Sequence, residues 1–345
     1  MHDLIYNYLK DKKLTTNNLS KENIHNLVHL SKKFHLVGFI AAVYELGNRP
    51  EHEELNSLRN FFIAKNLMMS HDMNLICSEL NEKQINYCIL KGPALNKSKV
   101  YKPNIRFFRD IDILVAKEDL NLAFKSLNNL GYKYVNKFAR NSCEFFGNHH
   151  HLPVMENQNG TFVELHHRAT ATRHYRECPI TNKILEERIF FKNTFIPCPE
   201  ALLGHILYHG IVQHRHSIGP IILFDIKQIM NKHNLKHHAY NKYVSMLKLD
   251  VEFGKVCKLL SDIEKKEEIH DFNQRLNNIR QNLALAETES ARTNISQILP
   301  KINDNFLFKK IVSTEFNYQI SRLSPIFPFF YFKELFKSIK NIRLF

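Results

Sequence analysis

The sequence contains little cysteine, and its cysteines are scattered along the chain. The six cysteines include no C-x-x-C pair and do not cluster. This spacing excludes a zinc ribbon, which needs closely paired ligands, and a small domain held together by disulfides. Isolated cysteines are typical of a reducing compartment, so we expect a cytoplasmic protein.

Long apolar runs are also lacking. The N-terminal sequence "MHDLIYNYLKDKKLTTNN" has no basic segment followed by an apolar stretch, so it does not resemble a secretory signal. The longest aromatic run, "IFPFFYF" at residues 326–332, is far shorter than the ~20 residues that cross a bilayer, and it contains Pro328. We therefore expect no transmembrane helix. The chain of 345 residues is 44% hydrophobic, which is enough for two or three domains.

Acidic residues are scarce relative to basic ones. There are 34 acidic and 48 basic residues, giving a formal net charge of +14, which favours an anionic partner such as a nucleotide or a nucleic acid. The excess is concentrated between residues 91 and 109, which hold no acidic residue. The six basic residues there are Lys91, Lys97, Lys99, Lys102, Arg106 and Arg109. A solvated basic face would give the same pattern, and this alternative stays open.

Residues 309–345 form a second basic segment. They hold seven basic and two acidic residues, interleaved with phenylalanines. Such a mixture binds a membrane surface or nucleic acid, or it forms an amphipathic helix that packs on the core and exposes its charged side. We favour the packed helix, and contact with an anionic surface through this segment stays open.

The hydrophobic pattern divides the chain into three regions. Apolar residues recur at helical spacing between residues 58 and 80, which predicts an N-terminal helical region, 1–83. Helical periodicity returns at Pro199 and predicts a C-terminal helical region, 196–345. Between these regions, in residues 84–195, segments with the period of a strand alternate with segments with the period of a helix, which predicts an α/β (α+β) unit. Its expected strands are 85–90, 110–115, 132–135, 150–155 and 161–167, with helices at 93–101 and 120–130 and a hairpin turn at 157–160.

Two aspartates stand in an otherwise apolar strand, "DIDILV". Side chains alternate faces along a strand, so Asp110 and Asp112 share one side while Ile111 and Ile113 face the core. Unit charges about 6 Å apart at an effective dielectric near 20 repel by roughly 3 kcal/mol. A bound cation reverses this effect, and magnesium binds one or two carboxylates together with substrate phosphates. The pair therefore predicts a metal clamp, although a solvent-facing strand end shows the same short motif.

A third carboxylate strengthens the metal hypothesis. Glu164 in "TFVELHHR" alternates with Val163 and Leu165, so it occupies the polar face of its strand. If that strand is adjacent to the first, three carboxylates converge. The turn at Lys91-Gly92 closes an earlier strand and opens a helix, a geometry that directs backbone amides toward phosphates.

The combined motifs resemble a known family. "LKGPAL", "RDIDILV", "VELHHR" and "HILYHG…FDIKQIM" occur in an order similar to that of an uncharacterised bacterial nucleotidyltransferase family of the polymerase-beta-like superfamily. The resemblance implies the nucleotidyltransferase fold, a mixed sheet flanked by helices, over residues 84–195. It also implies that Asp110, Asp112 and Glu164 are catalytic and bind metal. One departure is the turn, where superfamily enzymes commonly carry Gly-Ser and this chain has Lys-Gly-Pro.

The implied reaction transfers a nucleoside monophosphate from a nucleoside triphosphate to a hydroxyl-bearing acceptor and releases pyrophosphate. Two Mg²⁺ ions would be cofactors, and the acceptor would be a small molecule, a peptide or RNA. The nucleotide-binding candidates are Lys91, Gly92, Arg106 and Arg109, and possible substrate contacts are His166 and Arg168. Two alternatives stay open: a kinase-like phosphotransferase that uses the same clamp, and a non-catalytic basic protein that binds nucleic acid or an acidic partner.

Histidines are numerous, and one pair has metal-ligand spacing. His205 and His209 are four residues apart in a predicted helix, which places two imidazoles on one face. The glutamate of an H-E-x-x-H motif is absent. We therefore expect this helix to line the cleft or to pack on the core.

Overall fold

The computed structural model describes residues 2–10, 12–15, 21–46, 50–135, 150–171, 178–213, 221–235 and 241–265. All of them belong to one unit, Met1–Arg280, which the contacts within the chain separate from a second unit, Gln281–Phe345. The predicted basic helix at 309–345 falls outside the described residues. The division of the chain at residues 83 and 195 stays a prediction.

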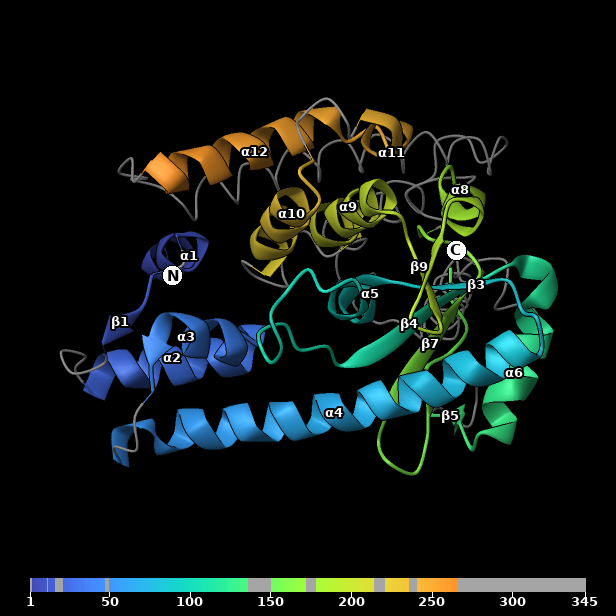
Figure 1. Cartoon of the computed structure of the whole chain (residues 1–345), viewed down its shortest axis with the longest axis horizontal. Coiled ribbons are helices and arrows are strands. Elements are labelled where there is room, and N and C mark those ends of the chain that lie inside the picture. Colours follow the sequence, from blue (N-terminus) through green and yellow to red (C-terminus); the bar gives the residue numbers. More distant parts are fainter. Residues whose placement is uncertain are drawn as a thin grey trace, which may run out of the picture. The chain divides into compact units, whose positions relative to one another are not determined.

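A five-stranded mixed sheet organises the first unit, as predicted (Figure 1). In spatial order its strands are β3 (Tyr87–Ile89), β4 (Asp110–Val115), β7 (Phe162–His166), β6 (Met155–Glu156) and β5 (Lys133–Tyr134). Strands β4 and β7 are parallel, whereas the other neighbours are antiparallel. The two central strands therefore run in the same direction and present corresponding positions side by side.

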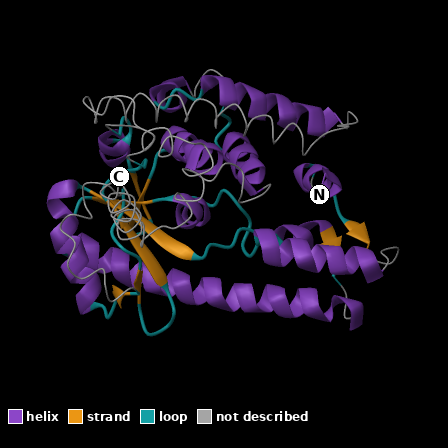
Figure 2. Cartoon of the chain, turned by 180° about the vertical axis from the view of Figure 1, so that it is seen from behind, coloured by secondary structure: helices purple, strands orange, loops and turns teal. Residues whose placement is uncertain are grey.

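Helices lie on both sides of the central strands. In both views α4 runs along one side, and α9 and α10 lie on the other (Figures 1 and 2). The helices that bear on the site are α2 (Lys21–Phe34), α3 (Val37–Val43), α4 (Glu53–Glu82), α5 (Lys91–Lys97), α6 (Leu120–Asn129), α9 (Pro199–Leu207) and α10 (Ile221–Lys232). The remaining described helices are α1 (His2–Leu9), α8 (Thr181–Glu186), α11 (Asn241–Met246), α12 (Asp250–Lys265) and the short 3-10 segments η1 (Pro50–His52) and η2 (Lys117–Asp119). None of the described helices has both the length and the apolar character needed to cross a lipid bilayer.

Strand β4 is buried on both faces. Ile111, Ile113 and Val115 are fully buried on the face opposite the aspartates, and burying such side chains stabilises the fold by about 2 kcal/mol each. On the opposite side Asp112 is also buried, at 1% exposure. An ionised side chain so deep in the sheet needs a compensating charge.

The predicted turn between β6 and β7 is present. Asn157 accepts hydrogen bonds from the amides of Asn159 and Thr161, and Gly160 adopts a φ of +72° that glycine tolerates. Buried Asp72 of α4 accepts hydrogen bonds from Asn157 and from the Thr161 hydroxyl, at 2.9 and 2.5 Å. This network fixes the start of β7 against α4.

The structure also differs from the expected elements. Helix α5 spans Lys91–Lys97, whereas residues 93–101 were expected. Lys91, two residues after β3, adopts a φ of +52° where the chain turns from the strand into the helix. A second hairpin, β8 (Ile189–Phe191) with β9 (Thr194–Ile196), was not predicted. A further two-residue pairing joins β1 (Leu14–Thr15) to β2 (Tyr44–Glu45). After α9 the helix continues as a π-helical segment, η4 (Tyr208–Gln213).

Replacing Gly38 by alanine is expected to destabilise the protein by about 2 to 3 kcal/mol. A Cβ atom at Gly38 in α3 would lie 2.2 Å from the carbonyl oxygen of Ile105, and backbone cannot move aside as a side chain can. This steric penalty exceeds the gain of about 1 kcal/mol in helix propensity. Urea denaturation measures the change.

The matched control is Gly254→Ala in α12. No atom lies within 4 Å of the position that a Cβ at Gly254 would occupy, and the residue is exposed. The free energy of unfolding of this variant is expected to rise by about 0.5 to 1 kcal/mol. Equal effects of the two substitutions would contradict the close approach of α3 to the segment before β4.

Stability is expected to depend on pH through Glu187, which joins α8 to α11. Its carboxylate accepts from Lys183, Lys242 and Tyr243, and these hydrogen bonds lower the pKa of Glu187 to about 2. A lowered pKa adds stability above the unfolded value of about 4.5, and that stability is lost as the pH falls toward 2. Melting temperatures of wild type and Glu187→Gln should therefore differ most above about pH 5 and converge in acid. Exposed Glu186, 4.0 Å from Lys183, supplies the control Glu186→Gln, which should show little dependence.

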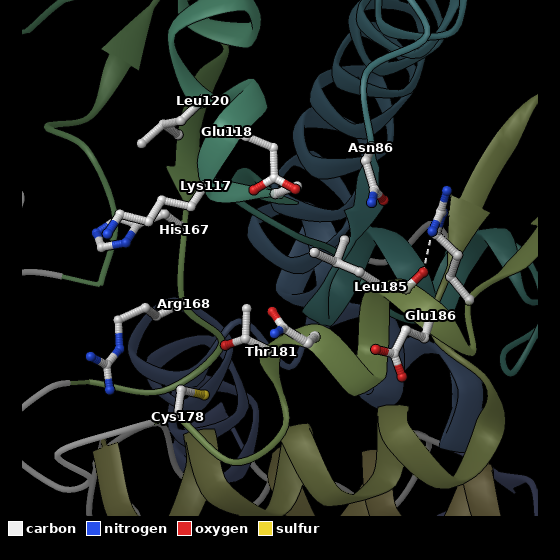
Figure 3. Close-up of a pocket in the computed structure, with 13 residues that line it drawn as sticks. Asn86, Lys117, Glu118, Leu120, His167, Arg168, Cys178, Thr181, Leu185 and Glu186 are labelled. Carbon is white, nitrogen blue, oxygen red and sulfur yellow. Dashed lines mark hydrogen bonds between the residues drawn. The ribbon is translucent and has the colours of Figure 1, made fainter.

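A cavity of about 920 Å³ opens where β4 and β7 end (Figure 3). Lys117 lies two residues after the end of β4, and His167 and Arg168 are the first two residues after β7. All three line this cavity together with Cys178 and Glu186. Neither Asp110, Asp112 nor Glu164 lines it. This cavity is therefore not the one that faces the predicted catalytic residues.

Candidate active site

The predicted carboxylates face a second cavity, of about 530 Å³. In the parallel register, Asp112 of β4 lies beside Glu164 of β7, and Asp110 lies beside Phe162. The period of two along each strand places Asp110, Asp112 and Glu164 on one face, and all three line this cavity. The structure thus brings together the three side chains that the sequence predicted to converge.

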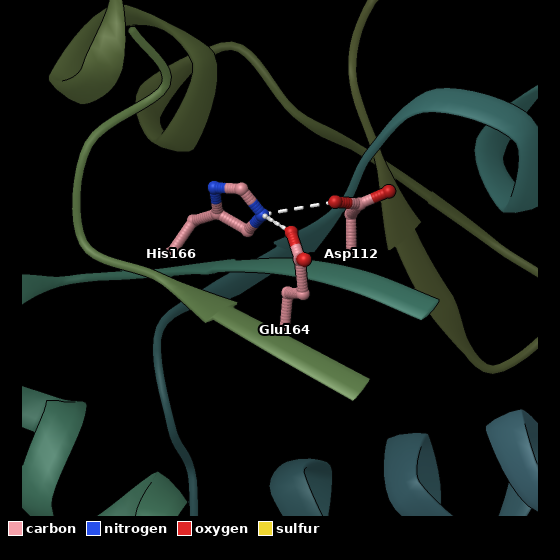
Figure 4. A group of neighbouring side chains, drawn as sticks. All are labelled: Asp112, Glu164 and His166. Atoms are coloured by element: carbon pink, nitrogen blue, oxygen red, sulfur yellow. Dashed lines mark hydrogen bonds and ion pairs between the residues drawn. The ribbon is translucent and has the colours of Figure 1, made fainter. Parts of the chain in front are cut away.

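Figure 4 shows His166 joined to both Asp112 and Glu164, and Asp112 has a further partner in Lys91. Oδ1 of Asp112 accepts from Lys91 Nζ at 2.7 Å and from His166 Nε2 at 2.9 Å. The same imidazole nitrogen lies 3.2 Å from Glu164 Oε2. Because both neighbours are carboxylates, Nε2 of His166 carries the proton and joins the two acids.

The charges in the cluster compensate one another. Burial alone would raise the pKa of Asp112, but the Lys91 ammonium and the His166 hydrogen bond hold that pKa well below its usual value. Burial would lower the pKa of Lys91, and the surrounding carboxylates Asp112, Glu164 and Asp110 raise it instead. Lys91 therefore stays a cation at 13% exposure and supplies the positive charge that this strand pair requires.

Asp110 has a different environment. Burial, followed by repulsion from Asp112, raises the pKa of Asp110 to about 6. Asp110 is only half-buried and makes no hydrogen bond with another described side chain, so its carboxylate is available to a ligand in the cavity. The two aspartates thus differ: Asp112 is fixed by protein partners, and Asp110 is not.

The other predicted nucleotide ligands lie around the same cavity. Lys91, Gly92, Arg106 and Arg109 all line it, and Arg109 is exposed. Arg106, however, is engaged by the protein: its Nε and Nη2 donate to the two oxygens of Asp225 at 2.9 and 3.0 Å, and its Nη1 donates to the Phe107 carbonyl. A Cβ at Gly92 would lie 2.8 Å from Cβ of Phe108, so glycine permits close packing there.

The two predicted substrate contacts are separated. His166 is 1% exposed and bonded to Asp112 and Glu164, which indicates that it orients these carboxylates. Arg168 lines the larger cavity, with His167, and not the cavity of the carboxylates. The difference arises because β7 ends at His166, so the strand alternation no longer applies at Arg168.

Several lining residues were not predicted. Asp225 of α10, His151 and Gln213 line the carboxylate cavity, as do His35 and Phe62 from the N-terminal helical region. The sequence gives no local signal for Asp225, whose partner Arg106 is more than a hundred residues away. The helix of His205 and His209 was expected to line the cleft or to pack on the core. His209 lines this cavity, whereas His205 is buried and lies 3.0 Å from the carbonyl of Ala169.

One group of side chains is close enough to hold a metal ion. Within the described residues, ligand atoms of Asp112, Glu164 and His166 all lie within 4.8 Å of one another. The two carboxylates suit Mg²⁺ or Mn²⁺, whereas Nε2 of His166 donates its proton to them and would have to lose that proton to become a metal ligand. The carboxylate pair therefore fits a divalent cation. Asp110 lies outside this group, and its role as a metal ligand stays a prediction.

Comparison with known proteins identifies the family. The family model described as uncharacterised nucleotidyltransferase matches residues 20–263, most of the chain. The chain belongs to this family, which confirms the predicted nucleotidyltransferase relationship; the bacterial origin and the wider superfamily stay predictions. No curated protein matches the chain.

Among solved structures, the chain is similar to the crystal structure of an antigenic nucleotidyltransferase-like protein from Paracoccidioides brasiliensis. The two share 16% sequence identity with a TM-score of 0.36, over 57% of this chain and 92% of the other. Similarity at this level supports no conclusion about activity.

Proposed function

We propose that the protein is a metal-dependent nucleotidyltransferase that transfers a nucleoside monophosphate from a nucleoside triphosphate to a hydroxyl group. The observation that carries the proposal is the parallel register of Asp112 and Glu164, which places two carboxylates side by side on the wall of a 530 Å³ cavity. Family membership supports the same reaction class. The cavity volume is within the range of small-molecule sites.

Asp112 and Glu164, with Asp110 beside them, are the residues that would hold Mg²⁺. When bound, such ions stabilise charge on the attacking and departing oxygens and orient the polyphosphate. His166 fixes the two carboxylates by its single N–H. The hydrogen bonds restrict the orientation of the two carboxylates, as residues that contact metal ligands commonly do.

In the proposed reaction the acceptor oxygen forms a bond to the α-phosphorus, and the bond from that phosphorus to the bridging oxygen breaks. Pyrophosphate leaves with the electron pair, and Glu164 is the candidate to take the acceptor proton. Lys91 and exposed Arg109 are the cations of this cavity placed to neutralise the triphosphate. Arg106 has its guanidinium engaged by Asp225 and supports the loop before β4.

The experiment that tests the proposal uses four α-³²P nucleoside triphosphates, each incubated with the protein, Mg²⁺ and a cell extract. Label is expected to move to a macromolecular or small-molecule acceptor and to disappear when Mg²⁺ is chelated. The fraction that becomes labelled distinguishes a small molecule, a peptide and RNA. No transfer from any triphosphate by folded wild-type protein would overturn the proposal.

Parallel reactions with γ-³²P triphosphates separate nucleotidyl transfer from kinase-like transfer. Label from the γ position is expected to appear only in pyrophosphate. Its appearance on the acceptor, with a nucleoside diphosphate as product, would assign phosphotransferase activity to the same site. Asp250→Asn, an exposed substitution at the start of α12, is the control that should keep full activity.

A further inference from the structure

The carboxylate cavity has an aromatic wall that the catalytic strands do not supply. Its members are His35, Phe62, Phe107 and Phe108. Phe62 stacks on Phe107 with ring centroids 5.5 Å apart and an interplanar angle of 21°, and His35 meets Phe62 edge to face, also at 5.5 Å. The wall combines residues that precede β4 with residues of the N-terminal helical region.

His35 is the member of this wall that is open to a ligand. The three phenylalanines are at most 9% exposed, whereas His35 is half-buried. His35 directly follows α2 and adopts a φ of +55°, a left-handed conformation that ends the helix. From this position the imidazole lines the cavity, in edge contact with Phe62.

The imidazole also has an unused polar atom. Nδ1 of His35 is buried and has no hydrogen-bond partner in the described part of the chain. Burial, followed by the charges of Arg109, Arg106 and Lys65, lowers the pKa of His35 to about 4. At neutral pH the ring is therefore uncharged, with one nitrogen that donates and one that accepts. The two nitrogens point in different directions, so the ring can offer one hydrogen bond to the edge of a nucleobase, which presents donors and acceptors.

We propose that His35 is a specificity-determining residue that contacts the nucleobase of the triphosphate, with its ring supported by Phe62 and Phe107. The proposal rests on the proposed function, because it assigns the base-binding side of the same cavity. Aromatic rings stack on any nucleobase, and a hydrogen bond from the ring nitrogen discriminates among the bases. The other apolar lining residues, Ile206, Ile221 and Ile222, are aliphatic and provide no ring.

The test compares His35→Gly with His35→Asn. Glycine and asparagine both tolerate a φ of +55°, so neither strains the turn after α2. Glycine removes the ring and its nitrogens, whereas asparagine keeps a polar group near the position of Nδ1. His29→Ala removes an exposed imidazole from the same helix and is the matched control.

Binding of ATP, GTP, CTP and UTP with Mg²⁺ is measured by titration calorimetry, together with inorganic tripolyphosphate, which lacks a base. His35→Gly is expected to weaken binding of the preferred triphosphate by about tenfold and to reduce the difference in affinity among the four triphosphates. Tripolyphosphate binding should not change. His35→Asn is expected to recover part of the base preference, and His29→Ala should match wild type.

Three results would overturn the inference. His35→Gly could bind all four triphosphates as wild type does, which would place the base elsewhere. It could lose tripolyphosphate affinity to the same extent, which would mean that His35 acts on the phosphate side. Wild-type protein that binds none of the four triphosphates would instead refute the proposed function itself, and the inference with it.

Discussion

Replacing Asp112 by asparagine is expected to lower the rate of nucleotide transfer by at least about a hundredfold. Asp112 lies beside Glu164 across the parallel strands and accepts from both Lys91 and His166. Its loss removes a carboxylate from the candidate metal group and leaves the Lys91 ammonium buried without its closest anion. The measurement is the initial rate of label transfer in Mg²⁺, at equal concentrations of folded protein.

Stability must be separated from catalysis in this variant. Removing one partner of a buried ion pair costs about 3 to 5 kcal/mol, so Asp112→Asn is expected to unfold at lower urea concentration. Asp110→Asn provides the comparison, because Asp110 is half-buried and is destabilised as an anion by burial and by Asp112. Asp110→Asn should lose activity without losing stability. Full activity in both variants would show that the carboxylates of β4 do not act in the reaction.

Replacing Asp225 by alanine is expected to destabilise the protein by about 3 to 5 kcal/mol. Asp225 is 2% exposed, binds Arg106 through both oxygens and accepts from the Tyr101 hydroxyl at 2.6 Å. Without Asp225, the guanidinium stays buried and unpaired, while α10 loses its polar link to the segment that enters β4. Urea denaturation monitored by circular dichroism measures the change.

A double substitution distinguishes loss of the pair from loss of packing. Arg106→Leu with Asp225→Leu removes both charges, and replacing a buried pair by apolar side chains is often close to neutral. The double variant is therefore expected to recover most of the stability lost in Asp225→Ala. A loss below about 1 kcal/mol in Asp225→Ala would contradict a tight buried pair. If Arg106 binds phosphate as well, the double variant will also bind triphosphates more weakly.

The elements around the site were predictable because their signals are local. Alternation in "DIDILV" and "TFVELHH" identified β4 and β7, and both lie within one residue of the expected ranges. The turn at Asn157 followed from residue types that favour a positive φ. The hairpin β8–β9 was missed because its strands are only three residues long and partly exposed, so no clear period develops.

The partners of the predicted side chains were not predictable. The residue type and sequence position of Arg106 are those of a phosphate ligand, but Asp225, which is 119 positions away, binds its guanidinium. Arg168 follows Glu164 by four residues and yet lines another cavity, because the strand ends between them. Such outcomes depend on which helices pack over the strands, and that information is spread over the whole chain.

The sequence by itself determined that Asp110, Asp112 and Glu164 share one face of a sheet, since strand periodicity is a property of the local backbone. Only the tertiary structure decided which groups compensate the charges of these carboxylates. Lys91 neutralises Asp112, His166 donates a hydrogen bond to it, and His35 and Phe62 extend the cavity from the N-terminal region. The physical reason is that a buried charge is stabilised by whatever lies within a few ångströms, and folding alone brings distant residues that close.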